Sequence, residues 1–193
     1  MKKLVVIAIA FLTLSAFTTI GNTWKSDPPH TQLGFTVTHL GINDISGAFE
    51  DVSITLNAKG EDLRDAAFSL VAQTVSVDTR VDARNNHLKS TDFFNAEKYP
   101  EMSFTSTEIK KEGNNRYSLT GELSLHGITK TVHLNVLDRG LVTNPMSNKE
   151  TRGIQVSGTI KRSDFGIGEK FPEAVISDEV RIIANAEFLQ DEN

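Results

Sequence analysis

The sequence predicts an all-β protein, an antiparallel up-and-down barrel of about eight strands with a short helical insertion at one end. Three observations lead to this prediction. Apolar and polar residues alternate over most of the chain, which is typical of strands with one buried and one solvated face. Short connections containing Gly and Asn join these segments, so successive strands are expected to pair as hairpins. A single segment has the spacing of an amphipathic helix.

The expected strands run from Leu33 to Phe188, with turn signals at "EGNN" (112–115) and "HGIT" (126–129). Each strand is recognised by mainly apolar residues at alternate positions, which would face the interior. In chain order these residues are Leu33, Phe35, Val37 and His39; Val52, Ile54 and Leu56; Phe68, Leu70 and Ala72; Met102 and Phe104; Tyr117, Leu119, Leu123 and Leu125; Val132, Leu134 and Val136; Ile154, Val156, Gly158 and Ile160; and Val180, Ile182, Ala184, Ala186 and Phe188.

Two architectures suit many antiparallel strands, a sandwich and a closed barrel. Sequential hairpins favour the barrel. A barrel of about eight strands either fills with its own side chains or holds one small ligand. The inward positions mix Phe with Leu, Val, Ile, Ala and Gly. A packed core and an apolar tunnel would have the same composition, so the sequence leaves this choice open.

The helical insertion interrupts the alternation before "HLKSTDFFNAEKYP" (87–100). Asp78 or Thr79 can cap its first turn with Asp82 as the acidic partner, which predicts a helix from about 79 to 88. Phe93 and Phe94 follow, and Pro100 returns the chain to an extended conformation. We expect the insertion to lie across the mouth of the barrel. One of the two phenyl rings would then seal the barrel end while the other faces the cavity, although an aromatic pair after a helix more often belongs to the core.

The N-terminus has the layout of a secretory signal peptide. Lys2 and Lys3 precede an apolar run from Leu4 to Leu12, which thins into Thr and Ser. We therefore expect a signal peptide over residues 1–21, a barrel domain over residues 22–193, and a periplasmic or secreted protein. An uncleaved membrane anchor is the alternative, at the short end of the length that spans a bilayer. The chain has no Cys, so neither a disulfide nor a lipid-modified Cys is available.

Composition and motifs exclude several classes of function. The formal net charge is −5, and basic clusters are absent, which argues against a nucleic-acid partner. None of the five histidines forms a short motif with a carboxylate that would suggest a metal site; they are His30, His39, His87, His126 and His133. Asp164-Phe165-Gly166 matches a kinase tripeptide without the other kinase motifs, and no Ser lies in a G-x-S-x-G elbow. We expect no metal and no enzymatic activity.

Four long blocks resemble those of the YceI-like family of exported, lipocalin-like barrels. They are "HTQLGFTVTHLGINDISGAFED" (30–51), "NNHLKSTDFFNAEKYPEMSFTST" (85–107), "YSLTGELSLHGITKTVHLNV" (117–136) and "KRSDFGIG" (161–168), in the order that the family shows. The resemblance implies a barrel around an elongated apolar cavity, with a polyisoprenoid or another long-chain amphiphile as ligand. It implies no cofactor other than such a bound lipid, and members of the family are not established enzymes.

We therefore expect an exported carrier that sequesters a polyisoprenoid, an isoprenoid quinone or a fatty-acid-like lipid. Its partners would be the lipid and, transiently, a membrane, and the protein would be a monomer or a homodimer. A stress-related or interaction protein with a packed barrel is the alternative, and an internal cavity distinguishes the two. The expected ligand-binding residues are Phe35, Val37, His39, Phe49, Phe68, Leu70, Phe93, Phe94, Phe104, Leu119, Leu134, Ile154, Val156 and Phe165, with Arg84, His87 and Lys89 near the head group. These three could instead form only a solvated face.

Overall fold

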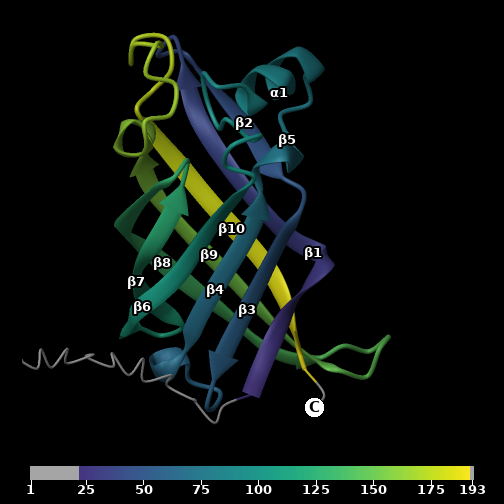
Figure 1. Ribbon diagram of the computed structural model, residues 1–193. Helices are drawn as coiled ribbons and strands as arrows, with labels where there is room; N and C mark the ends of the chain where they lie inside the picture. The colour runs from purple at the N-terminus through teal and green to yellow at the C-terminus, as the bar shows by residue number, and fades with distance from the viewer. Residues whose placement is uncertain (1–21, 192–193) are drawn as a thin grey trace, which may run out of the picture.

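A computed structural model of the protein describes residues 22–191, which form one barrel with a helix at one end (Figure 1). The expected signal peptide, residues 1–21, lies outside the described residues. Between residues 22 and 191, the chain contains ten strands, one α-helix and three short 3-10 helices. None of the helices in this range is long and apolar enough to cross a membrane.

Eight strands form the closed barrel, as predicted. In order around the barrel they are β1 (Asn22–His39), β3 (Val52–Ala58), β4 (Ala67–Gln73), β6 (Glu101–Gly113), β7 (Arg116–Leu125), β8 (Ile128–Thr143), β9 (Glu150–Lys161) and β10 (Glu179–Gln190). Every neighbouring pair is antiparallel, and β10 pairs with β1 to close the ring. Closure leaves these strands without a free edge, which removes the exposed hydrogen-bonding groups that promote aggregation.

Strand β1 is long enough to serve two neighbours on one side. Its first residues, Asn22–Lys25, pair with β3, whereas Leu33–His39 pair with β2 (Asn43–Phe49). The short β5 (Val77–Asp78) then pairs with β2. Between the two halves of β1, the register with β10 shifts from Ser26 to Thr31, at a bulge that contains Pro28 and Pro29. Proline lacks the N–H that a strand ladder needs, so a bulge is where it is tolerated.

Helix α1 (Asp82–Lys89) begins later than the sequence predicted, and neither expected residue caps it. Val81 is the N-cap and provides no side-chain hydrogen bond. Arg80 has a φ of 65°, and this left-handed residue separates Thr79 from the helix. Asp78 and Thr79 instead bond to the buried Asn85, which accepts from the Thr79 N–H at 2.7 Å and hydroxyl at 2.6 Å and donates to Asp78 at 2.6 Å. These bonds fasten α1 to the end of β5.

The end of the barrel away from α1 is closed around a buried ion pair. The Arg152 Nη2 atom lies 2.6 Å from Asp138 Oδ2, and both side chains are almost fully buried. Arg152 also donates to the carbonyl of Glu61, in the connection between β3 and β4. Asp138 accepts a further bond from the Gly140 N–H at 3.0 Å. The two charges are therefore well supplied with hydrogen-bond partners, which a buried pair requires.

Substitution of Arg152 by Ala should lower the free energy of unfolding by about 3–5 kcal/mol, because it leaves the Asp138 carboxylate buried without its counter-ion. The matched control is Lys25→Ala, which removes an exposed ion pair with Asp191 and should change stability little. Urea denaturation of both variants measures the difference. Equal stability of the two variants would contradict this account of the closed end.

An apolar cavity at the helical end of the barrel

The half of the barrel nearest α1 encloses a cavity of about 450 Å³. All eight barrel strands contribute to its wall, together with β2, α1 and two irregular segments. One is the pair Phe93 and Phe94, and the other is the loop of residues 166–177, called the mouth loop below. The described residues that line the cavity include no carboxylate and no lysine; their polar members are His39, Thr79, Arg84, His87 and Arg162.

Most of the residues that the sequence assigned to ligand binding line this cavity. They are Phe35, Val37, His39, Phe49, Phe68, Leu70, Phe93, Phe94, Phe104, Leu119, Leu134 and Val156. Ile154 is buried but lies toward the closed end, where it is the cross-strand partner of Asp138. Phe165 is also buried outside the lining, and its carbonyl oxygen lies 2.9 Å from His126 Nδ1. The structure thus places these two side chains in the core rather than in the cavity wall.

Phe93 and Phe94 both line the cavity, so the expected division between one sealing ring and one lining ring is not what the structure shows. Phe93 stacks on Phe171 of the mouth loop with ring centroids 5.0 Å apart, and His87 meets it edge-on at 5.0 Å. Phe94 meets Phe49 of β2 edge-on at 5.4 Å. Aromatic contacts therefore join the helical insertion, the mouth loop and the barrel wall around one end of the cavity.

The three expected head-group residues are placed differently from one another. Arg84 lines the cavity and donates to the Thr79 hydroxyl and carbonyl, each at 2.8 Å. His87 lines it as well, with its Nε2 atom 3.5 Å from Asp92. A hydrogen bond from Lys170, assisted by His87, lowers the pKa of Asp92. Lys89 is not among the lining residues.

Arg162 is, with Thr79, a polar lining residue that sequence reasoning did not assign to the site. Its buried guanidinium donates to five backbone carbonyl oxygens, those of Ile167, Gly168, Phe171, Ile176 and Ser177, at 2.6–3.2 Å. All five belong to the mouth loop, so one side chain holds this loop against the barrel. No periodic pattern marks such a residue, because its partners are main-chain groups of an irregular segment.

Most of the other missed lining residues fall into two groups. The first lies on strand faces that alternation predicted to point inward, so its signal was present in the sequence; its members are Leu33, Ile54, Met102, Leu123, Leu125, Val132, Ile160, Val180, Ile182 and Ala184. The second group comes from the mouth loop, where no alternation exists, and consists of Ile167, Phe171, Val175 and Ile176. Their place in the wall depends on the loop's folding back over the barrel.

The fold and the cavity define the class as a closed antiparallel barrel with an internal apolar site at one end. The family model "YceI-like domain" matches residues 24–188, and the chain therefore belongs to the YceI-like family. UPF0312 protein plu2095 of Photorhabdus laumondii is 36% identical over 179 residues, covering 90% of this chain and 92% of the relative.

Two solved structures have the same fold. The YceI protein of Campylobacter jejuni superposes with a TM-score of 0.72 at 30% identity, covering 80% of this chain and 90% of the other. A polyisoprenoid binding domain from Saccharophagus degradans superposes with a TM-score of 0.69, covering 89% of this chain and 99% of the other. At 16% identity, the second likeness shows the fold alone.

Replacement of Arg162 by Met should loosen the mouth loop, because five carbonyl oxygens lose a charged donor. We expect a loss of about 2 kcal/mol or more in stability and faster amide hydrogen exchange across residues 166–177. The control is Arg181→Met, which removes an exposed bond to Asp44. If loop exchange were the same in both variants, Arg162 would not be what holds the loop.

Proposed function

We propose that the protein is a binding protein that sequesters one long-chain amphiphile inside the barrel, with an isoprenoid chain as the leading candidate. The observation that carries the proposal is the apolar cavity of about 450 Å³. Protein interiors are close-packed, and a well-packed barrel would contain only small voids. A cavity of this size lies within the range of small-molecule sites. It therefore favours a carrier over the alternative of a packed interaction protein.

The volume limits the length of chain that can be enclosed. If each carbon group takes about 30 Å³, the volume that a water molecule occupies in the liquid, the cavity of about 450 Å³ holds about 15 carbons in all. That corresponds to about three isoprene units, counting their methyl branches. The Arg152–Asp138 pair and Ile154 occupy the closed end, so they oppose a deeper extension. Each enclosed methylene contributes about 0.8 kcal/mol, although ordering of the chain offsets part of the sum. The rest of a longer lipid would have to remain outside.

The polar lining favours a neutral or anionic head group over a cationic one. Arg84 and Arg162 place two guanidinium groups in the lining, and His87 adds an imidazole near the helical end. A cationic head would meet these groups with no lining carboxylate to pair with it. Quinone, alcohol, carboxylate and phosphate head groups are all neutral or anionic, so each of them is compatible with this lining. Lys89 is left out of the proposed head-group site because it does not line the cavity.

Binding, rather than catalysis, is the proposed activity. The lining Arg84 and Arg162 are bonded to protein oxygens. The Thr79 hydroxyl donates to Asn85 and accepts from Arg84 rather than bonding to a lining histidine, so it is not paired with a base. The polyisoprenoid binding domain of Saccharophagus degradans, which has the same fold, supports a lipid as the ligand.

We also propose that the protein is exported to the periplasm or beyond and meets membranes through its helical end. The basic and apolar N-terminal residues support export. Leu40 and Ile42, in the turn between β1 and β2, are 52% and 84% exposed. They follow directly on the lining residue His39, so an apolar tip stands beside the cavity. Such a tip would bring the site close to a lipid surface during transfer.

Leu134→Trp should fill the cavity and weaken the binding of a fluorescent isoprenoid or fatty-acid probe by about tenfold or more, since the indole occupies space that the chain needs. Asn135→Trp is the matched control, because residue 135 is the exposed neighbour on the same strand. Equal probe binding by both variants, each with an intact fold by circular dichroism, would show that the ligand does not occupy this cavity.

Isoprenoid alcohols of two, three, four and nine isoprene units should compete with the probe in a characteristic way. Affinity is expected to rise up to about three units, where the cavity is full, and to level off beyond. Competition titrations measure the four affinities. A continuous rise through the nine-unit alcohol would mean that the chain is enclosed along a path other than the cavity described above.

A further inference from the structure

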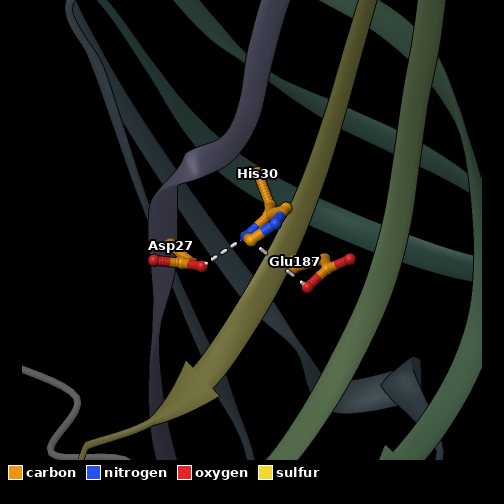
Figure 2. A group of neighbouring side chains, drawn as sticks. All are labelled: Asp27, His30 and Glu187. Carbon is orange, nitrogen blue, oxygen red and sulfur yellow. Dashed lines mark hydrogen bonds and ion pairs between the residues drawn. The ribbon is translucent and has the colours of Figure 1, made fainter. Parts of the chain in front are cut away.

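Three side chains that bind metals in other proteins meet on the outside of the barrel, away from the lipid cavity. Asp27 and His30 come from the β1 bulge, and Glu187 comes from β10 (Figure 2). The His30 Nδ1 atom lies 2.6 Å from Asp27 Oδ2 and 3.9 Å from Glu187 Oε2. Figure 2 shows both carboxylates directed toward the imidazole ring. One ligand atom from each residue lies within 4.8 Å of the others.

These distances are close to those of a metal-bound set. Two ligand atoms bound tetrahedrally at about 2 Å from zinc lie about 3.3 Å apart. The distances from His30 Nδ1 to Asp27 Oδ2, 2.6 Å, and to Glu187 Oε2, 3.9 Å, lie below and above that value. The side chain of His30 is 57% exposed and that of Glu187 is 44% exposed, so both can shift without disturbing the core. Three protein ligands would leave the fourth position to water.

The ligand types select among the common divalent ions. One imidazole nitrogen and two carboxylate oxygens suit zinc and similar transition metals. Calcium takes six to eight oxygen ligands and magnesium favours a full octahedron of oxygens, which this set does not provide. Zinc would bind at the Nδ1 atom of His30, which faces both carboxylates.

The position of the cluster gives the ion a structural role. Strands β1 and β10 close the barrel, but their ladder is interrupted between Ser26 and Thr31. Asp27 and His30 lie inside this interruption, and Glu187 lies on the facing strand. A metal held by all three would cross-link the two strands at the place where main-chain hydrogen bonds between them are missing.

We propose that Asp27, His30 and Glu187 form a zinc site that clamps the closing strand pair of the barrel. The site is independent of the proposed lipid-binding function, because none of its residues lines the cavity. The sequence alone predicted no metal here: Asp27 and His30 are close in the chain, but Glu187 reaches them only through barrel closure.

Isothermal titration of the untagged, metal-free protein with zinc at neutral pH tests the proposal. We expect one zinc per chain, with binding weakened by about tenfold or more in His30→Ala and in Glu187→Gln. His133→Ala is the control, because His133 is an exposed strand histidine on β8 with Thr120 as its partner, and it should bind zinc like the parent. Calcium and magnesium should give no comparable binding.

Thermal unfolding gives a second measurement. Zinc at about 100 times its dissociation constant should raise the unfolding midpoint of the parent and of His133→Ala by about 5–10 °C, and leave that of His30→Ala unchanged. Both site variants alter exposed or half-buried side chains, so they should fold. Absence of zinc binding by the parent, or binding that persists in either site variant, overturns the proposal.

Discussion

Pairing of β1 with β10 is the constraint on which the rest of the structure depends. It converts a sheet of sequential hairpins into a ring, so that inward side chains face one another across an interior instead of facing solvent. β1 has to serve β3, β2 and β10 along its length. The bulge at residues 27–30 lies between the segments that pair with β3 and with β2. The same bulge presents Asp27 and His30 to Glu187 on the outside.

The two ends of the barrel are closed by different interactions. At one end the charges of Arg152 and Asp138 are buried together, and their hydrogen bonds tie the β3–β4 connection to the wall. At the other end the closing elements are irregular segments. Asn85 fastens α1 to β5, and Arg162 gathers the carbonyl oxygens of the mouth loop. A buried arginine paired with a carboxylate thus closes one end, whereas a buried arginine surrounded by carbonyls holds the other.

This difference explains why the cavity lies at the helical end. Main-chain carbonyls satisfy Arg162 from one side and leave the interior beside it to apolar side chains, while aromatic contacts among Phe93, Phe94 and Phe171 surround the space. The irregular segments at this end of the cavity are held by ring contacts and hydrogen bonds rather than by a continuous strand ladder. Local opening of such segments requires less free energy than separation of barrel strands. Access for a long chain is therefore expected at this end.

Alternation of apolar and polar residues by itself determined the strands, the barrel and most of the cavity wall, because every second side chain of a strand points to the same face. Phe35, Phe104 and Leu134 were assigned in this way, and they line the cavity.

Alternation does not show how far along the barrel axis a residue lies. Ile154 and Val156 follow the same alternation, yet only Val156 reaches the cavity. The predicted start of α1 was wrong because Arg80 has a left-handed backbone, and because Asp78 and Thr79 bond to Asn85 instead of capping the helix. Tertiary structure alone decided the roles of Arg162 and of the Asp27–His30–Glu187 cluster. The partners of Arg162 are backbone oxygens of an irregular loop. Glu187 comes close to Asp27 and His30 only through closure of the barrel.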